Sequence, residues 1–437
     1  MSIETLSVPY FLQVELTYAC NSHCIFCYNP TRGKRPDKDH VWNVIRAVAE
    51  AQVPLVQLTG GEVSLLRELN EYADYLADYS KVSIVTNAIR RHDLTSNISK
   101  IFLSLHGDKE THERITSNRD TYDVIVNNIE HYVGRGYEVA TDVLLCSENY
   151  DQMYSLIGRA AELGMCEVFI NRFQGGGFGV ERMNALMPSV EQFRAALDQI
   201  IDARRDFGIT VSFGTAIPLC ADKRLVSEGL EFNCQMGSRF AAVAPNGDLR
   251  LCNQSLKQYG NITETPLTEL WQQRSLNDYR DMRWVTGVCR DCPLLDRCGS
   301  GCRVDNSQSE DYCPDAFVRG LEKRPELVAD ILNESGDIRT VPEIPSSPNT
   351  GSRRIRTEKD LLIIDKYAEK YLVRSNYSAL VVDQRCVDIC VKSKDGVIDE
   401  VDLWRSVQQS DSIPLRDDVM GRYVDHLVAA GVLVEEA

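Results

Sequence analysis

The sequence contains no apolar run that approaches the roughly 18 to 20 residues needed to cross a membrane as a helix. Residues 1–20 lack the basic region and the small-residue cleavage site of a secretory signal peptide. The chain has fewer basic than acidic residues: 48 Lys and Arg against 64 Asp and Glu, which gives a net charge of −16. This balance argues against non-specific attraction to DNA, RNA or anionic lipid, but it leaves a peptide partner open. We therefore expect a cytoplasmic protein that binds neither nucleic acid nor membrane.

Cysteine, in contrast, is abundant. The chain of 437 residues, long enough for two or three domains, contains 15 cysteines. Three lie between residues 20 and 27 and seven between 234 and 313. Disulfides are rare in a reducing compartment, so thiols clustered at metal-ligand spacing indicate iron–sulfur or zinc sites. The remaining five are Cys146, Cys166, Cys220, Cys386 and Cys390.

Residues 11–213 alternate between short β-rich segments and longer segments with apolar residues at helical spacing. The strand candidates are 11–17, 55–59, 82–86, 101–105, 139–145 and 167–171. The clearest helix candidates are 39–51, 121–136 and 151–164. Repeated strand–helix units predict a parallel sheet with helical crossovers, either a barrel or an open doubly wound sheet.

Residues that carry chemistry gather directly after these strands. In chain order they are Cys20, Cys24, Cys27, Gly60, Gly61, Glu62, Asn87, His106, Gly107, Cys146 and Arg172. The carboxyl ends of parallel strands form one face, and α/β barrels build their active sites on that face. We therefore expect these side chains to surround one active site.

The stretch YACNSHCIFCYNP (18–30) places three cysteines within eight positions, at Cys20, Cys24 and Cys27. A structural metal site closes with four protein ligands, whereas three thiolates on a 4Fe–4S cluster leave one iron open for chemistry. One face of a helix is the structural alternative. Asn21, Ser22 and Pro30 have low helix propensity and follow directly after a strand, which disfavours a helix here.

This C-x-x-x-C-x-x-C motif, with Phe26 before its last cysteine, resembles the radical S-adenosylmethionine superfamily. LTGGEV (58–63) and SLHG (104–107) carry the same resemblance. In that superfamily the open iron binds S-adenosylmethionine, whose reductive cleavage gives a 5′-deoxyadenosyl radical that abstracts a substrate hydrogen. The resemblance implies a catalytic role for the three cysteines and a partial (β/α)6 TIM-like barrel over residues 1–215.

The resemblance also implies a set of cofactor-binding residues, namely Phe26, Gly60, Gly61, Glu62, Asn87, Ser104, Arg114 and Arg172. Within this set, the Gly-Gly-Glu stretch would contact the amino group of the methionine moiety, Ser104 the ribose and Arg114 the carboxylate. Two positions depart from the family pattern without removing a ligand: Val63 replaces a usual proline, and His106 a common aspartate. If the cysteine motif were absent, a different interpretation of these residues would be favoured. Gly60 and Gly61 would form a tight turn, Ser104 would be an ordinary strand residue, and Glu62 would be a solvated surface carboxylate.

The seven later cysteines are too many for one four-ligand site and one too few for two. A zinc ribbon is the alternative, because such ribbons also use a C-x-x-C pair. The order of these cysteines resembles the SPASM extension, here residues 216–334, of radical enzymes that mature peptides. The resemblance assigns one auxiliary 4Fe–4S cluster to Cys289, Cys292, Cys298 and Cys313, and another to Cys234, Cys252 and Cys302.

These assignments give three clusters in all, and the last one lacks an evident fourth ligand. Cys220 is the nearest candidate, and an open iron is an equal alternative. Auxiliary clusters would accept electrons from an oxidised product radical or bind the substrate. Sulfatase-maturing relatives commonly carry an aspartate base after the ligand that matches Cys252, whereas Asn253 stands here. That difference disfavours such a maturase.

A polar, proline-containing stretch (335–357) predicts a linker, and residues 358–437 then regain periodicity. Two strands and two short helices in 371–407, followed by a long helix and a final strand in 416–436, give a winged-helix-like outline. This outline resembles the peptide-binding chaperone of pyrroloquinoline quinone biosynthesis, the RiPP recognition element. Such domains add a leader peptide as an extra strand to a sheet edge. The alternative is a packing appendage or a dimerisation module.

Among the scattered cysteines, Cys166, Cys386 and Cys390 are expected to be buried packing residues. Cys146 follows a strand, so it is either another packing residue or a hydrogen-atom donor to a substrate radical.

Together these features predict a radical peptide maturase that abstracts a hydrogen from a residue of a ribosomally made precursor peptide. The resulting radical would be oxidised as a new bond forms, and a flavodoxin or ferredoxin would supply the electron for cleavage of S-adenosylmethionine. The alternatives are a radical dehydrogenase of small alcohols, a formylglycine-type maturase, and a zinc-stabilised binding scaffold without chemistry.

Overall fold

The computed structural model describes residues 7–33, 35–282, 284–285, 287–306 and 315–318, together with six short strands between 354 and 436. The chain forms two compact units, one made chiefly of Val8–Gly336 and the other chiefly of Asp337–Ala437. In the described part of the chain, no helix combines the length and the apolar character needed to span a membrane.

A ten-stranded sheet forms the centre of the first unit. Seven strands follow one another in parallel: β1 (Phe11–Glu15), β2 (Leu55–Thr59), β3 (Lys81–Thr86), β4 (Ile98–Ser104), β5 (Val139–Leu145), β6 (Glu167–Arg172) and β7 (Thr210–Phe213). This order confirms the predicted partial barrel and its first six strands. The seventh strand was not predicted, because its four residues form too short an apolar run to stand out.

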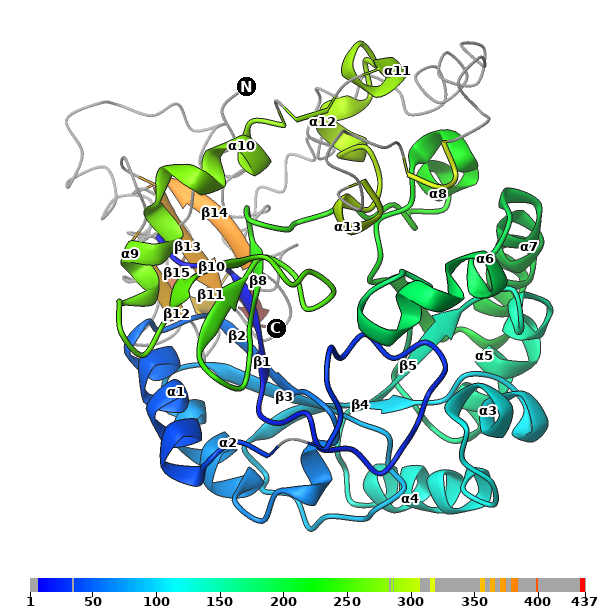
Figure 1. Ribbon diagram of the computed structural model, residues 1–437, viewed down its shortest axis with the longest axis horizontal. Coiled ribbons are helices and arrows are strands. Elements are labelled where there is room, and N and C mark those ends of the chain that lie inside the picture. The colour runs from blue at the N-terminus through cyan, green and yellow to red at the C-terminus, as the bar shows by residue number, and fades with distance from the viewer. Residues whose placement is uncertain are drawn as a thin grey trace. The chain divides into compact units, whose positions relative to one another are not determined.

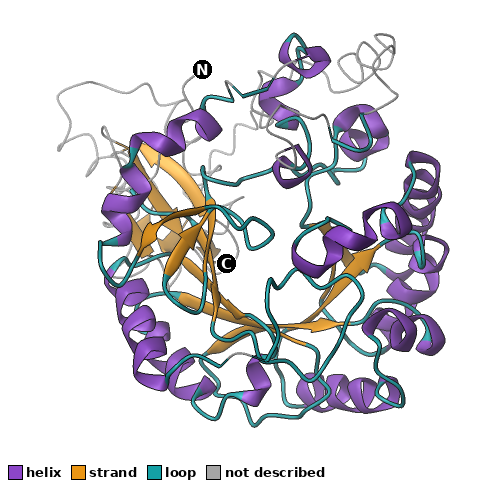
Figure 2. Ribbon diagram, in the orientation of Figure 1, coloured by secondary structure: helices purple, strands orange, loops and turns teal. Residues whose placement is uncertain are grey.

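Helices cover the outer side of these strands, which form an arc (Figures 1 and 2). They are α1 (Lys38–Glu50), α2 (Leu69–Ala77), α3 (Lys109–Thr116), α4 (Tyr122–Gly134), α5 (Met153–Glu162) and α7 (Val190–Phe207). The short α6 (Met183–Leu186) instead packs its Leu186 with Cys146 and Phe173. The three predicted helices are confirmed in α1, α4 and α5.

The strands alternate between a buried face and a half-buried face. In β4, Ile101 and Leu103 are buried in the same core as residues of α4, whereas Lys100, Phe102 and Ser104 are only half-buried. Successive side chains of a strand point to opposite faces, so the second set lies on the inner face of the arc. The inner face therefore keeps partly accessible side chains.

Three further strands extend the sheet beyond β1. β8 (Phe240–Val243) pairs in parallel with β1, and β9 (Asp248–Arg250) and β10 (Gln258–Asn261) follow as antiparallel neighbours. No strand was predicted between residues 215 and 320, although β8, β9 and β10 form there. Strands of three or four residues give little periodicity. The Asn246-Gly247 pair before β9, with Gly247 at φ +86, was the hairpin signal that could have revealed them.

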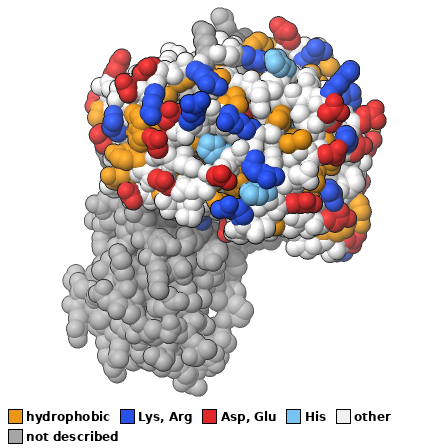
Figure 3. All heavy atoms as spheres, turned by 90° about the horizontal axis from the view of Figure 1, so that it is seen from below, with side chains coloured by type: hydrophobic (Ala, Val, Ile, Leu, Met, Phe, Trp, Pro, Cys, Tyr) orange, Lys and Arg blue, Asp and Glu red, His pale blue; other side chains and the backbone are white. Residues whose placement is uncertain are grey.

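Short helices complete the first unit between and after these strands. They are η1 (Val63–Leu65), η2 (Tyr150–Gln152), η3 (Gly177–Arg182), η4 (Leu219–Ala221), α8 (Arg224–Ser227), α9 (Leu267–Gln272), η5 (Arg274–Leu276), α10 (Asn277–Arg280), α11 (Gly287–Arg290), α12 (Leu295–Cys298) and α13 (Arg303–Asn306). The segment from α11 to α13 carries most of the later cysteines. On the face in Figure 3, basic and acidic side chains of the described residues are interspersed.

The second unit contains two three-stranded sheets. One has the order β15 (Ile398–Asp399), β11 (Arg354–Thr357), β16 (Leu433–Glu436), and the other β12 (Leu362–Asp365), β13 (Lys370–Arg374), β14 (Ala379–Asp383). β16 is the predicted final strand. The predicted linker is wrong at its end, where β11 forms because it pairs with β15 and β16. The predicted helices, Cys386 and Cys390 lie outside the described residues.

Candidate functional site

The three cysteines of the first motif lie on the irregular segment that leads from β1 to α1. All are half-buried, and none is part of a helix, so the helix-face alternative is wrong. The backbone N–H of Ser22 donates to Sγ of Cys20 at 3.4 Å. The backbone N–H of Cys27 donates to the carbonyl oxygen of Cys24 at 3.3 Å. The segment, here called the cysteine loop (residues 18–30), is thus folded on itself around its thiols.

Asn87, directly after β3, attaches this loop to the sheet. Its side-chain amide donates to Oδ1 of Asn21 at 2.7 Å and to Oγ of Ser22 at 3.0 Å. The same nitrogen lies 4.0 Å from Sγ of Cys20. Asn87 therefore positions the first cysteine, while its predicted contact with the cofactor stays a prediction.

Gly60 and Gly61, after β2, pass directly against the start of the cysteine loop. The backbone N–H of Gly61 donates to the carbonyl oxygen of Thr17 at 2.6 Å. A Cβ on Gly60 would lie 2.3 Å from that oxygen, and a Cβ on Gly61 would lie 2.2 Å from the carbonyl oxygen of Ala19. Gly60 also has φ +139, a conformation that side chains rarely allow. Only glycine fits at this approach.

Glu62 is buried, with 1% of its surface exposed, so the solvated-carboxylate alternative is wrong. Its Oε1 accepts from the backbone N–H of Ser64 at 2.9 Å and from Oγ1 of Thr86 at 2.5 Å. Its Oε2 accepts from the backbone N–H of Asn87 at 2.7 Å. All three donors are neutral groups, so the carboxylate is held in a fixed position without a counter-charge among them. Such a group suits the ammonium of an amino acid.

Replacing Gly61 with alanine is expected to displace the cysteine loop, because the new Cβ would clash with the carbonyl oxygen of Ala19 next to Cys20. We expect the purified protein to lose the iron of one cluster and its S-adenosylmethionine cleavage to fall on the order of 10²-fold. Iron analysis and 5′-deoxyadenosine formation measure both effects. Gly134→Ala is the matched control, since a Cβ there meets nothing within 4 Å. Full iron content and normal cleavage in Gly61→Ala would contradict this role.

His106 holds the aromatic residue of the motif in place. It is 4% exposed, and its ring packs edge-on against Phe26 with centroids 5.0 Å apart. The ring also stacks on His112, and its Nδ1 accepts from the backbone N–H of Leu144 at 3.1 Å. Burial and the neighbouring His112 hold the pKa of His106 well below its usual value. His106 is therefore a neutral packing group where relatives commonly carry an aspartate.

The remaining cofactor candidates lie in different surroundings. Ser104 is half-buried at the end of β4, on the inner face of the sheet. Arg114, on α3, is about half exposed and pairs with Glu148. Cys146 is fully buried and packs with Phe173 in a small apolar cluster. The roles predicted for Ser104, Arg114 and Cys146 stay predictions.

Arg172, at the end of β6, forms a two-pronged ion pair with Asp315 of the cysteine-rich segment. The Nη1–Oδ1 distance is 3.1 Å and the Nη2–Oδ2 distance 2.6 Å, and both side chains are fully buried. The same carboxylate accepts from the backbone N–H of Cys302 at 2.9 Å and from that of Phe317 at 2.9 Å. The structure thus gives Arg172 a structural role that joins the barrel to the segment of a predicted cluster ligand.

The later cysteines fall into two groups. Cys234 contributes to the raised pKa of Cys252 and therefore lies near it, on either side of β8 and β9. Cys289 and Cys292 likewise both contribute to the raised pKa of Cys298. Cys302 is buried, and Cys313 lies outside the described residues.

The backbone is arranged to support several of these sulfurs as metal ligands. In each case the N–H of the residue two positions further along lies against the sulfur, as in iron–sulfur sites, where such bonds stabilise thiolates. The pairs are Ser22 with Cys20, Gln254 with Cys252, Leu294 with Cys292, and Ser300 with Cys298.

Burial nevertheless raises the pKa of these thiols, to about 11 for Cys20 and Cys298 and to about 12 for Cys252. Nearby thiols raise it further in each case. Thiolates gathered at such positions need a cationic partner, which the iron of a cluster provides. The residues present therefore fit iron–sulfur clusters.

Residues 14–160 match the radical SAM superfamily, and residues 234–293 match the iron–sulfur cluster-binding domain SPASM. The chain is therefore similar to the radical SAM superfamily over most of its barrel and to SPASM over part of its cysteine-rich segment. Its cofactors are S-adenosylmethionine and 4Fe–4S clusters.

Among related proteins, the PqqA peptide cyclase of Streptomyces rochei is 24% identical over 367 residues, covering 80% of this chain and 99% of that protein. Mycofactocin maturase MftC of Mycolicibacterium smegmatis is 27% identical over 316 residues, or 68% of this chain and 79% of that protein. The structure of Streptococcus suis SuiB bound to precursor peptide SuiA shares the fold, with a TM-score of 0.59 and 18% identity, over 72% of this chain and 76% of that one.

A buried ion pair on the inner face of the barrel was not predicted from the sequence. Glu15 of β1 pairs with Arg250 of β9, and both side chains are almost fully buried. Burial raises the pKa of Glu15 to about 7, although Arg250 and the hydroxyl of Tyr18 counteract the shift. Both charges also act on Cys252, so the pair lies beside a predicted auxiliary-cluster ligand. A charged residue near the end of a predicted strand was the available signal.

A glycine-rich segment after β6 (174–179) was also missed. The backbone N–H of Gly179 donates to the carbonyl oxygen of Cys27 at 3.0 Å. A Cβ on Gly176 would meet the side chain of Gln254, two residues after Cys252. This segment therefore contacts both the cysteine loop and the neighbourhood of the later cysteines.

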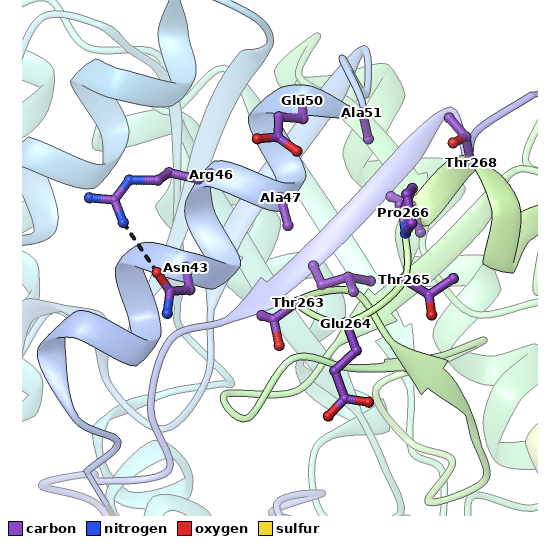
Figure 4. Close-up of a pocket in the computed structure, with 12 residues that line it drawn as sticks. Asn43, Arg46, Ala47, Glu50, Ala51, Thr263, Glu264, Thr265, Pro266 and Thr268 are labelled. Carbon is purple, nitrogen blue, oxygen red and sulfur yellow. Dashed lines mark hydrogen bonds between the residues drawn. The ribbon is translucent and has the colours of Figure 1, made fainter.

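One pocket among the described residues does not involve the cysteine loop (Figure 4). It is formed by α1 and residues 262–268, and it contains no cysteine and no predicted site residue. Among its lining residues, Arg46 bonds to Asn43 on the same helix at 3.2 Å. We therefore keep the cysteine loop as the candidate site.

Proposed function

We propose that this chain is a radical SAM enzyme that abstracts a hydrogen from a residue of a ribosomally synthesised precursor peptide, followed by oxidative bond formation. The observation that carries the proposal is the likeness to PqqA peptide cyclase along 99% of that protein's length. The mycofactocin maturase supports the same class of substrate.

Within this proposal, Cys20, Cys24 and Cys27 hold the catalytic cluster. Glu62 receives the ammonium of S-adenosylmethionine, and Ser104 lies near its ribose. When bound, the cluster and S-adenosylmethionine supply the electron and the 5′-deoxyadenosyl radical. The half-buried inner face contributes polar groups for an extended substrate, among them Lys100, which pairs with Glu167 at 2.8 Å.

The cysteine-rich segment holds two further clusters, for three in all, and takes up the electron that the product radical releases. A flavodoxin or ferredoxin reduces the catalytic cluster. A formylglycine-type reaction is disfavoured, because the residue beside Cys252 is Asn253, whose Oδ1 lies 3.4 Å from the sulfur and cannot act as a carboxylate base.

The direct test is anaerobic purification, iron and sulfide analysis, and incubation with S-adenosylmethionine, a reductant and a candidate precursor peptide. We expect iron and sulfide for about three clusters, 5′-deoxyadenosine, and a peptide whose mass has changed. Zinc without sulfide would support the binding-scaffold alternative. Cleavage that is coupled to a small alcohol and not to a peptide would support the dehydrogenase alternative.

In this proposal, residues 358–437 recognise the leader of the precursor by adding it as a strand to a sheet edge. Each three-stranded sheet of the second unit has two edges among the described strands, and strand addition uses such an edge. The leader would then hold the core peptide near the barrel by raising its effective concentration.

Truncation near Pro348, outside the described residues, tests this role. We expect the shortened enzyme to keep its iron and to cleave S-adenosylmethionine slowly, since the ten-stranded sheet belongs to the first unit. Its affinity for the full-length precursor should fall by a few kcal/mol, or on the order of 10²-fold, as measured by anaerobic calorimetry or fluorescence anisotropy. As a control, a core peptide without its leader should be modified equally poorly by both forms. Unchanged precursor affinity would make the second unit a structural appendage.

A further inference from the structure

Asp142, in the middle of β5, is a half-buried carboxylate on the inner face of the barrel. Its neighbours Thr141 and Val143 are buried on the other face of the strand, and Val143 belongs to the core beneath the outer helices. The parallel register of β4 and β5 places Asp142 directly beside Ser104. Since successive side chains of a strand alternate between faces, Asp142 and Ser104 point into the same inner space.

The hydrogen bonding of Asp142 leaves one of its oxygens available. Nδ2 of Asn171, on β6, donates to Oδ1 of Asp142 at 2.8 Å. Oδ1 of Asn171 accepts from Oγ1 of Thr215 at 3.2 Å, which turns the amide N–H groups toward Asp142. Among the described residues, none donates to Oδ2 of Asp142. This second oxygen is free to accept from a bound molecule.

The other carboxylates near this inner space already have partners. Glu15 and Glu167 each form an ion pair, and Glu62 accepts three hydrogen bonds. Of the acidic residues in the described strands β1 to β7, Asp142 is thus the one that lacks a cationic partner. Placing a carboxylate in such surroundings costs stability, and proteins accept this cost chiefly at functional sites.

Burial raises the pKa of Asp142 to about 6, although the hydrogen bond from Asn171 counteracts the shift. The charged side chains and histidines of the elements packed against β5 are Lys100 and His106 with β4, Glu167 and Arg172 with β6, and Asp123, Glu130 and His131 on α4. Lys100 pairs with Glu167, Arg172 forms the ion pair described above, and His106 is neutral. The residues of α4 lie on the outer side of the sheet. A carboxylate with a pKa close to neutral pH is suited to take up a proton.

We propose that Asp142 is the base that takes up the proton released when the peptide radical is oxidised and the new bond forms. Bond formation removes two hydrogens from the peptide, one from each of the two atoms that become joined. The first leaves as the atom that the 5′-deoxyadenosyl radical abstracts. The second leaves as a proton, which passes to Asp142, while one electron passes to an iron–sulfur cluster of the cysteine-rich segment. This inference rests on the proposed function and names its base, a part that Asn253 cannot play.

The test compares full-length enzyme with its Asp142→Asn variant, each incubated with S-adenosylmethionine, dithionite and the precursor peptide. We expect the variant to form 5′-deoxyadenosine and to bind the precursor with unchanged affinity. The amount of modified peptide per 5′-deoxyadenosine should fall on the order of 10²-fold, because hydrogen abstraction remains while the proton has no acceptor. In D2O, the unused peptide radical is reduced by dithionite and takes a deuteron from the solvent. The recovered peptide should therefore gain one deuterium.

The pH dependence provides a second test through Asn171. The base must be unprotonated, so in the unaltered enzyme the yield per 5′-deoxyadenosine should rise with pH through about 6. Asn171→Ala removes the hydrogen bond that lowers the pKa of Asp142, so this rise should move to higher pH. Asp142→Asn should give a low yield without this rise. Infrared difference spectra of the protein without peptide should show a carboxyl group that titrates near the same pH and is absent from Asp142→Asn.

Asp202→Asn is the matched control, since Asp202 is well exposed on α7 and should lose none of the yield. The thermal midpoint of anaerobic Asp142→Asn at pH 8 should be no lower than that of the unaltered enzyme, because the change removes a buried charge without a counter-charge. This measurement separates the loss of a base from the loss of the fold.

Two results would overturn the role of Asp142. Asp142→Asn with the same yield per 5′-deoxyadenosine as Asp202→Asn would make Asp142 a packing residue. Weaker precursor binding with an unchanged yield would make it a binding residue for the peptide. Both results would leave the proposed function standing. An unaltered enzyme that modifies no peptide would instead refute the proposed function, and the role of Asp142 would fall with it.

Discussion

Replacing Cys20, Cys24 and Cys27 together with alanine is expected to reduce the cleavage of S-adenosylmethionine to the level of the protein-free reaction. The three thiols lie on one loop, and no other cysteine group is built into the carboxyl ends of β1 to β3 among the described residues. In the proposed function these thiols hold the catalytic cluster, so without them the electron would have no route to the sulfonium. Chromatography of 5′-deoxyadenosine after incubation with dithionite measures the effect.

The same variant should retain the auxiliary iron, because Cys234, Cys252 and the α11–α13 segment belong to a separate part of the first unit. Cys166→Ala serves as the control that a cysteine replacement does not by itself abolish cleavage. The expectation that Cys166 is a buried packing residue is wrong, because its side chain is exposed after α5. 5′-Deoxyadenosine formation at the wild-type rate in the triple variant would show that the catalytic cluster has been assigned to the wrong cysteines.

The second large effect is expected at the buried Arg172–Asp315 ion pair. Replacing Arg172 with methionine leaves a buried carboxylate without its counter-charge, which destabilises a protein by about 3–5 kcal/mol. For a unit of this size we expect the thermal midpoint of the anaerobic holoprotein to fall on the order of 10 °C. Because Asp315 also accepts from the N–H of Cys302, auxiliary iron should be lost earlier in the transition.

Arg205→Met is the matched control for this prediction. Arg205 pairs with Asp202 at 3.2 Å, but both side chains are well exposed, and such pairs contribute only about 0–1 kcal/mol. The double variant Arg172→Met with Asp315→Leu should recover part of the loss, because neither charge remains buried. If Arg172→Met changes stability no more than Arg205→Met, the pair does not join the barrel to the cysteine-rich segment.

Several features were predictable from the sequence because their signals are local. The alternation of apolar residues over residues 11–171 gave six strands in the correct order, since periodicity depends only on neighbours along the chain. The cysteine loop was recognisable because its three cysteines lie within eight positions. The Gly-Gly-Glu stretch was recognisable for the same reason, although the close approach of Gly61 to Ala19 became visible only in the fold.

The short strands were not predicted from the sequence, because their stability comes from the neighbouring strands with which they pair. β8 has four residues and is placed by β1, from which it is separated by more than two hundred positions. β11 forms within a predicted linker because β15 and β16 pair with it. A strand of this length carries too little pattern to reveal itself without its neighbours.

The sequence by itself therefore determined the fold class, the cysteine loop and the resemblance to the radical SAM superfamily. Only the tertiary structure decided which distant residues meet. Arg172 and Asp315 are 143 positions apart, Glu15 and Arg250 are 235 apart, and Leu219 reaches Cys298 across 79 positions. Local periodicity contains no information about such contacts, because they arise when the sheet closes and brings separate segments into one low-dielectric interior. There, charges and thiols must find partners, and the folded chain determines which ones are within reach.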